Sequence, residues 1–233
     1  MSGAVREVLP LDGDEFAGWT ARVIEDAIHT AVTMRGICRI VLAGGRTPAQ
    51  VYRVLAERAD VPWAQVEVFI GDERCVPPTH ADSNFRMIDD TLLSVVPIPS
   101  AQIHRLRGEL GAPGAAAEYQ ALLEPRPEPK FDFVLNGMGA DGHTASLFPG
   151  DQRVDASREW AMPAVAPAQF AIAERVGLTM RALCSTRVSC VLCVGAEKRV
   201  VREAILSGDA AAQLLPAARL HGLDRTLWIV DRL

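Results

Sequence analysis

Apolar residues recur along the chain with two periods, and segments of the two kinds alternate. From Glu15 to Met34 they return every three or four positions, the spacing of an amphipathic helix, and Gly36 marks its end. Short apolar runs with the composition of buried strands follow. The predicted strands are ICRIVLAG (37–44), VEVFIGDE (66–73), IHRL (103–106), FDFVLNG (131–137), RVGLTM (175–180), SCVLCVG (189–195) and RTLWIVD (225–231).

Helices are predicted between these strands. Pro48 suits a first helical position, and AQVYRVLAERA continues from it. Ser83 or Asp82 can cap a helix through FRMIDDTLLSV. Further helices are expected over 114–123 and AEKRVVREAIL. Strand and helix alternate over the first two thirds of the chain, which predicts one α/β domain over residues 1–233: a mostly parallel sheet with helices on both faces. Loops at the carboxyl ends of such strands form the ligand crevice.

The bulk composition excludes several classes of protein. A formal net charge of −5 argues against a nucleic-acid binder. No apolar run approaches the roughly 20 residues of a membrane span, and the N-terminal residues lack the apolar core of a signal peptide, so a cytoplasmic protein is expected. Cys190 and Cys193 form a C-x-x-C inside an apolar run, which favours buried free thiols over a redox pair.

The first unusual loop, AGGRTP, joins a strand to a helix. Gly44 and Gly45 let the backbone turn its N–H groups toward a ligand, Thr47 adds a hydroxyl, and the helix start carries a positive dipole end. These features suit a phosphate, although the full ATPase P-loop pattern is absent. An ordinary turn with Thr47 as the helix N-cap explains the same residues.

The second loop, GDERCVPPTHADSN, follows the strand VEVFI. Asp72 and Arg74 stand where the sheet delivers side chains to the crevice, which favours a role in binding for both. Glu73 is interpreted as a solvated loop residue in a salt bridge.

The third loop, NGMGADGHTASLFPG, fits the spacing G-x-G-x-x-G but not the rest of a dinucleotide site. Asp141 would oppose a pyrophosphate, and Pro149 ends any helix soon after His143. Glycines on both sides instead let the chain bend and present His143 to a crevice as a proton-transfer group. Asp141 could hold the imidazole ring or touch substrate hydroxyls. Ser146 has no G-x-S-x-G elbow around it, so it is not interpreted as a nucleophile.

Two cations complete the set of candidate residues. Arg175 lies in ERVGLTM, and Lys198 stands at the start of a predicted helix. A cation at the positive end of a helix dipole is unfavourable unless an anion binds there, although a solvated lysine is the simpler alternative. The five histidines are scattered and form no metal motif.

AGGRTP, GDERCVPPTHADSN and NGMGADGHTASLFP, in this order, resemble the 6-phosphogluconolactonases of the glucosamine-6-phosphate isomerase/6-phosphogluconolactonase superfamily, which have a Rossmann-like fold. RVGLTM, GAEKR and LWIVD extend the resemblance over nearly the whole chain. It implies hydrolysis of 6-phospho-D-glucono-1,5-lactone without cofactor or metal, by a monomer or a homodimer. By similarity His143 is the general base, and two groups of residues bind the substrate. The phosphate group comprises Gly44, Gly45, Arg46, Thr47, Arg175 and Lys198, and the sugar group comprises Asp72, Arg74 and Asp141.

The sequence also departs from the family pattern. Arg46 stands where a serine is commoner, and a guanidinium there still favours phosphate. Asn136 replaces an expected leucine. In the isomerase branch a glutamate stands at the position of Phe148 and assists ring opening, so the aromatic residue argues against an amino-sugar phosphate isomerase. A sugar-phosphate sensor, the remaining alternative, is expected to carry a helix-turn-helix.

Overall fold

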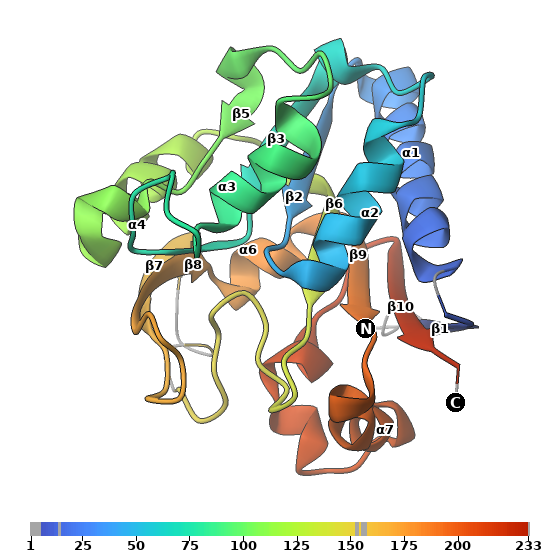
Figure 1. Cartoon of the computed structure of the whole chain (residues 1–233), viewed down its shortest axis with the longest axis vertical. Helices are drawn as coiled ribbons and strands as arrows, with labels where there is room; N and C mark the ends of the chain where they lie inside the picture. Colours follow the sequence, from blue (N-terminus) through green and yellow to red (C-terminus); the bar gives the residue numbers. More distant parts are fainter. Residues whose placement is uncertain (1–5, 14, 152–153, 155–157, 233) are drawn as a thin grey trace.

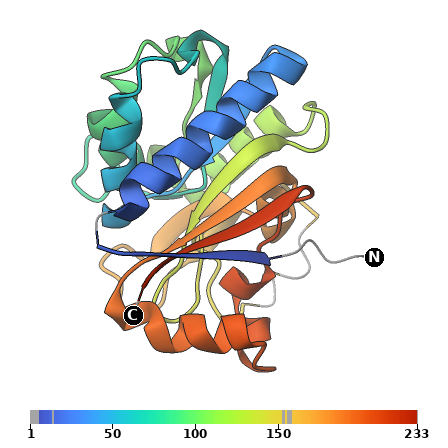
Figure 2. The same cartoon turned by 90° about the vertical axis from the view of Figure 1, so that its right-hand side faces the viewer.

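The centre of the molecule is a seven-stranded sheet whose strands are all parallel, in the order β1-β10-β9-β6-β2-β3-β5. This computed structural model describes residues 6–13, 15–151, 154 and 158–232. Figure 2 shows β1 beside β10, although the two strands come from opposite ends of the chain. The strands are β1 (Arg6–Leu11), β2 (Cys38–Leu42), β3 (Val66–Ile70), β5 (Ile103–His104), β6 (Phe131–Gly137), β9 (Thr186–Cys193) and β10 (Arg225–Asp231).

Helices cover both faces of this sheet, as the sequence predicts (Figure 1). Side chains alternate along each strand, so Ile40 and Leu42 of β2 join one hydrophobic cluster and Val41 joins the other. The first cluster includes residues of α1 (Glu15–Arg35), α2 (Arg46–Ala56) and α3 (Asn84–Ile88). The second includes residues of α4 (Gly111–Leu123), α6 (Met180–Cys184) and α7 (Arg199–Ser207).

A second, antiparallel sheet packs on the side of α4. It has the order β4-β8-β7 and consists of β4 (Asp72–Arg74), β8 (Glu174–Leu178) and β7 (Ala161–Val165). VEVFIGDE is therefore two strands in two sheets, and its prediction as one strand is wrong. The chain leaves the main sheet at Gly71, whose N–H donates to Leu42 O and whose carbonyl accepts from Leu178 N. The sequence pattern did not reveal β1 or β7.

Several predicted boundaries also shift. The helix expected from Pro48 begins at Arg46, because Gly45 serves as N-cap, so Pro48 is its third residue. Ser83 is confirmed as a cap, since its hydroxyl accepts from Arg86 N at 3.2 Å. The helix behind it changes to a π-helical turn at Asp89–Leu93. RVGLTM ends as a strand at Leu178, because the Thr179 side chain caps α6. The 3-10 turns are Trp63–Gln65, Ser100–Gln102, Gly108–Leu110, Ala196–Lys198, Ala212–Leu214 and Pro216–Arg219.

The C-x-x-C cysteines lie within β9 and are fully buried free thiols, as predicted. Burial raises the pKa of Cys190 to about 12 and that of Cys193 to about 11, so both are protonated at neutral pH. No helix in the described part of the chain is long and apolar enough to cross a membrane.

Candidate active site

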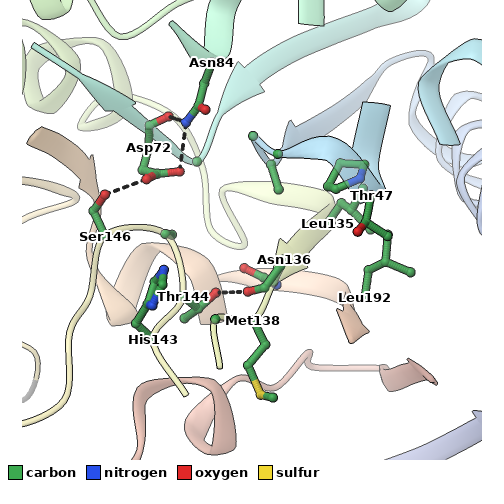
Figure 3. Close-up of a pocket in the computed structure, with 18 of the residues that line it drawn as sticks. Thr47, Asp72, Asn84, Leu135, Asn136, Met138, His143, Thr144, Ser146 and Leu192 are labelled. Carbon is green, nitrogen blue, oxygen red and sulfur yellow. Dashed lines mark hydrogen bonds between the residues drawn. The ribbon is translucent and has the colours of Figure 1, made fainter. Parts of the chain in front are cut away.

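The carboxyl ends of β2, β3, β6 and β9 border one pocket of about 430 Å³. Figure 3 shows part of its lining, with His143, Ser146 and Asp72 on one side and Thr47 across from them. Three distant sequence motifs therefore meet around one cavity. Of the residues predicted for the site, those that line it are Gly44, Gly45, Arg46, Thr47, Asp72, Arg74, His143, Arg175 and Lys198.

The AGGRTP turn presents the start of α2 to the pocket. Gly45 has φ 110° and ψ 166°, a conformation that side-chain-bearing residues rarely adopt. Thr47 is the second helical residue, so its interpretation as the N-cap is wrong. The N–H groups of Arg46 and Thr47 have no acceptor within the helix, because a first turn has none, and the exposed Arg46 adds a guanidinium. The turn thus presents donors of the kind that suit an anion.

Arg74 and Arg175 are direct partners in the antiparallel β4–β8 pair. Partners in such a pair project from the same face, so two like charges stand side by side at the pocket wall. Arg175 is 6% exposed, and burial together with the Arg74 charge lowers its pKa. Arg74 Nη1 donates to Asp82 O at 2.5 Å, and Arg175 Nε donates to Ile172 O at 3.2 Å. A bound anion between them would relieve the repulsion.

Lys198 follows the end of β9 and is the N-cap residue of α7. Its placement at a helix start, predicted from the sequence, is confirmed. Lys198 lines the pocket together with its neighbour Glu197. The charged residues of the lining are four cations and two carboxylates: Arg46, Arg74, Arg175, Lys198, Asp72 and Glu197. The pocket is therefore positive although the whole chain is acidic.

Glu73 is not a solvated loop residue, so that interpretation is wrong. It is 2% exposed, and its carboxylate accepts from Arg74 N, Asn84 N, Phe85 N and Ser83 Oγ at 2.7–2.9 Å. Burial raises its pKa, although the four donors oppose the rise. The carboxylate stands at the start of α3 and ties that helix to β4. The sequence offers one signal for this role, the serine cap ten residues later.

Asp72 is held from two sides. Asn84 Nδ2 donates to its carbonyl at 2.7 Å and to Oδ1 at 3.3 Å, and Ser146 Oγ donates to Oδ2 at 2.5 Å (Figure 3). Ser146 and Ala145 have φ of 59° and 45°, so both stand in the left-handed region that disfavours residues other than glycine. Backbone strain of this kind is typical of functional sites. The contact of Ser146 with Asp72 has no signal in the sequence, where Ser146 was weighed only as a nucleophile.

His143 and Asp141 form the closest pair of titratable side chains in the loop. His143 Nδ1 lies 2.5 Å from Asp141 Oδ1, which also accepts His143 N at 3.1 Å. Burial alone would raise the pKa of Asp141, but the hydrogen bonds from His143 outweigh it and hold that pKa below its ordinary value. An ionised Asp141 can only accept, so it places the ring proton on Nδ1 and leaves Nε2 as the basic nitrogen.

Asp141 is absent from the residues that line the pocket. Of the two roles left open for it, the contact with Nδ1 supports holding the ring, and its place in the sugar site stays a prediction. The loop permits this contact because of Gly139. A Cβ on Gly139 would lie 2.2 Å from two atoms of the His143 ring and 2.8 Å from Asp141 Oδ1. The imidazole therefore packs against a backbone that has no side chain.

Two phenylalanines enclose the same imidazole. The Phe148 ring lies 5.0 Å from that of His143 at 37°, and the Phe170 ring lies 5.5 Å away at 90°. Phe148 is 5% exposed, so it is part of an apolar wall beside the imidazole. Phe170 was not predicted from the sequence, because it lies in a segment without a clear period or motif. Among the described residues, no group of three or more histidine, cysteine or acidic side chains could hold a metal ion.

Comparison with known proteins supplies the family. Residues 11–228 match the family described as glucosamine-6-phosphate isomerases/6-phosphogluconolactonase. The chain belongs to this family. A probable 6-phosphogluconolactonase 3, chloroplastic, of Oryza sativa subsp. indica is 34% identical over 97% of this chain and 74% of its own. The 6-phosphogluconolactonase of Mycobacterium bovis is 34% identical over 100% of this chain and 97% of its own.

The fold agrees with this assignment. The crystal structure of 6-phosphogluconolactonase from Thermotoga maritima superposes with a TM-score of 0.87 at 30% identity, over 98% of this chain and 100% of that one. The predicted α/β architecture, with a mostly parallel sheet and helices on both faces, is therefore confirmed both by the strand order and by this relative.

Proposed function

We propose that the protein hydrolyses 6-phospho-D-glucono-1,5-lactone to 6-phospho-D-gluconate, with His143 as general base. The observation that carries this proposal is one pocket of about 430 Å³ with an imidazole on one side and a helix start and cations on the other. A volume of this order fits a small ligand such as a hexose phosphate. The family and the names of the relatives support the same reaction.

The phosphate end is formed by donors from three parts of the chain. The N–H groups of Arg46 and Thr47 at the start of α2 provide directional hydrogen bonds, and Arg175 and Lys198 provide charge. Anchoring at this end fixes the lactone ring in the remaining space, where Asp72 accepts hydrogen bonds from sugar hydroxyls. Binding energy at the phosphate thus orients the reacting carbonyl group near His143.

The chemical step needs a base with a free lone pair. Because Asp141 holds the proton on Nδ1, Nε2 of His143 takes a proton from water as the water oxygen attacks C1 of the lactone. The charge that develops on the carbonyl oxygen is stabilised by backbone N–H groups of the glycine turns and by Arg74. When the bond between C1 and the ring oxygen breaks, the imidazolium returns the proton to that oxygen. The open-chain acid is released.

An amino-sugar phosphate isomerase is the main alternative, because both activities occur in the family description. Phe148 argues against it, since an apolar ring stands where the isomerase reaction has its additional carboxylate. A sugar-phosphate sensor would need the pocket but not the pairing of His143 with Asp141.

A coupled assay tests the proposal. Freshly prepared phosphogluconolactone and glucosamine 6-phosphate are supplied in parallel, and the rate of spontaneous lactone hydrolysis is subtracted. We expect acceleration of lactone hydrolysis and no deamination or isomerisation of the amino sugar. Acceleration with glucosamine 6-phosphate alone would reverse the assignment, and binding of both compounds without turnover would identify a sensor.

A further inference from the structure

Phe170 stands between the two ends of the proposed active site. It lies in the turn that joins β7 to β8, which is closed by hydrogen bonds from Ala166 N to Ala173 O at 2.8 Å and from Phe170 N to Pro167 O at 3.0 Å. Figure 1 shows this turn beside the yellow loop that carries His143. The side chain is half-buried and lines the pocket.

The ring touches a proposed phosphate ligand and the proposed base at once. The Arg175 guanidinium lies over the Phe170 ring, 5.1 Å from its centroid. The Phe170 ring also makes an edge-to-face contact with the His143 ring, with a centroid distance of 5.5 Å. Phe148 packs against it at 5.5 Å and closes the apolar wall behind the imidazole. Cation–π and edge-to-face contacts both have preferred geometries, so a shift of either partner displaces the ring from its optimum.

Arg175 also holds the turn in which Phe170 lies. Its Nε donates to Ile172 O at 3.2 Å, so the guanidinium contacts both the backbone of the turn and the Phe170 ring. At 6% exposure Arg175 has little freedom to move without moving the turn. A chain of packed groups thus runs from Arg175 through Phe170 to His143.

We propose that Phe170 is a positioning residue that transmits occupancy of the anion site at Arg175 to the orientation of the His143 ring. This inference rests on the proposed function, because it takes Arg175 as a phosphate ligand and His143 as the base. Phe170 has no proton to transfer. Phe170 affects turnover because it keeps the imidazole of His143 aligned when a phosphate binds to Arg175.

The test combines kinetics with NMR on three variants. Phe170→Leu removes the ring and keeps an apolar side chain, Phe170→Tyr keeps the ring, and Val165→Ala is a control at a 65% exposed position of the same hairpin. The Cε1–H signal of His143, one of five histidines, is assigned from its loss in His143→Ala. Inorganic phosphate is titrated at constant ionic strength, and its inhibition constant is measured in the lactone assay.

We expect Phe170→Leu to lower kcat about tenfold, since small misplacement of a reacting group is costly, while Phe170→Tyr stays within about threefold of the wild type. Phosphate should shift the His143 signal in the wild type and in Phe170→Tyr, and at least half of that shift should be lost in Phe170→Leu at saturating phosphate. The direct electrostatic effect of phosphate on the His143 signal persists in all variants. The difference in phosphate-induced shift between the variants therefore reports the coupling between Arg175 and His143.

Three results would overturn the proposal: a wild-type kcat in Phe170→Leu, an equal phosphate-induced shift in Phe170→Leu and the wild type, or no shift in the wild type. Failure of the proposed function has another signature. If His143→Ala turned over lactone normally, the histidine would not be the base, while the NMR comparison would still show whether Phe170 couples the two side chains.

Discussion

Arg74 and Arg175 face each other across the antiparallel β4–β8 pair, so two guanidinium groups stand side by side at the wall of one pocket, where each donates to a backbone carbonyl. Like charges in directly opposed positions destabilise a strand pair. The arrangement is explained if the normal state of the site contains an anion.

Arg175→Met should raise KM for the lactone at least tenfold, because a charged hydrogen bond contributes about 1.5–3 kcal/mol, with a smaller change in kcat. Steady-state kinetics measures both constants, and Arg53→Met, an exposed arginine of α2, is the control. Inorganic phosphate should raise the Tm of the wild type more than that of Arg175→Met. An unchanged KM together with equal stabilisation by phosphate would remove Arg175 from the anion site.

Asp141→Asn should lower kcat about 10²-fold with little change in KM. An amide no longer fixes the ring proton of His143 on Nδ1, so the imidazole can adopt the tautomer in which Nε2 carries the proton and cannot act as a base. Kinetics at several pH values measures the loss. A variant with wild-type kcat would show that the ring is oriented by Phe148 and Phe170 alone.

Asp141→Asn should also change how the free energy of unfolding depends on pH. The pKa of Asp141 is lower in the folded protein, so its contribution to stability is present above the ordinary carboxyl pKa of about 4 and is lost as the pH falls through the folded value. Between pH 5 and 3 the wild type should therefore lose more stability than Asp141→Asn in urea unfolding. Parallel losses would contradict the assigned direction.

Ser146→Ala should lower kcat/KM about tenfold, because Asp72 loses a short hydrogen bond from a hydroxyl and with it a fixed orientation toward the substrate. The backbone change is small, since alanine and serine are similarly strained at φ 59°. Ser207→Ala, an exposed serine of α7, is the control. If kcat/KM were unaltered in Ser146→Ala, the Ser146 hydroxyl would stabilise only the local turn and would have no role in orienting Asp72 toward the substrate.

Glu73→Gln should destabilise the fold by about 1–3 kcal/mol, because an amide NH2 would face two of the four donors that now point at the carboxylate. Thermal and urea unfolding measure the loss, with the exposed Glu118→Gln as a matched control. Equal stability of the two variants would show that water replaces the carboxylate at the start of α3.

The sequence predicted the α/β architecture well because its strands are buried on both faces and separated by amphipathic helices such as α2. It predicted the place of His143, Arg74 and Lys198 because parallel strands deliver their following residues to one edge of the sheet. It failed where tertiary contacts decide the structure. Nothing local distinguishes the buried Glu73 from a solvated glutamate, and the second sheet depends on pairing of residues about 100 positions apart, such as Asp72 with Gly177.

The turnover of His143→Ala, measured beside its affinity for 6-phosphogluconate, decides whether this histidine is the base. We expect kcat to fall at least about 10²-fold while the dissociation constant of the product stays within about threefold, because base catalysis is lost and the phosphate contacts remain. A corrected kcat close to that of the wild type, with equally tight product binding, would contradict it.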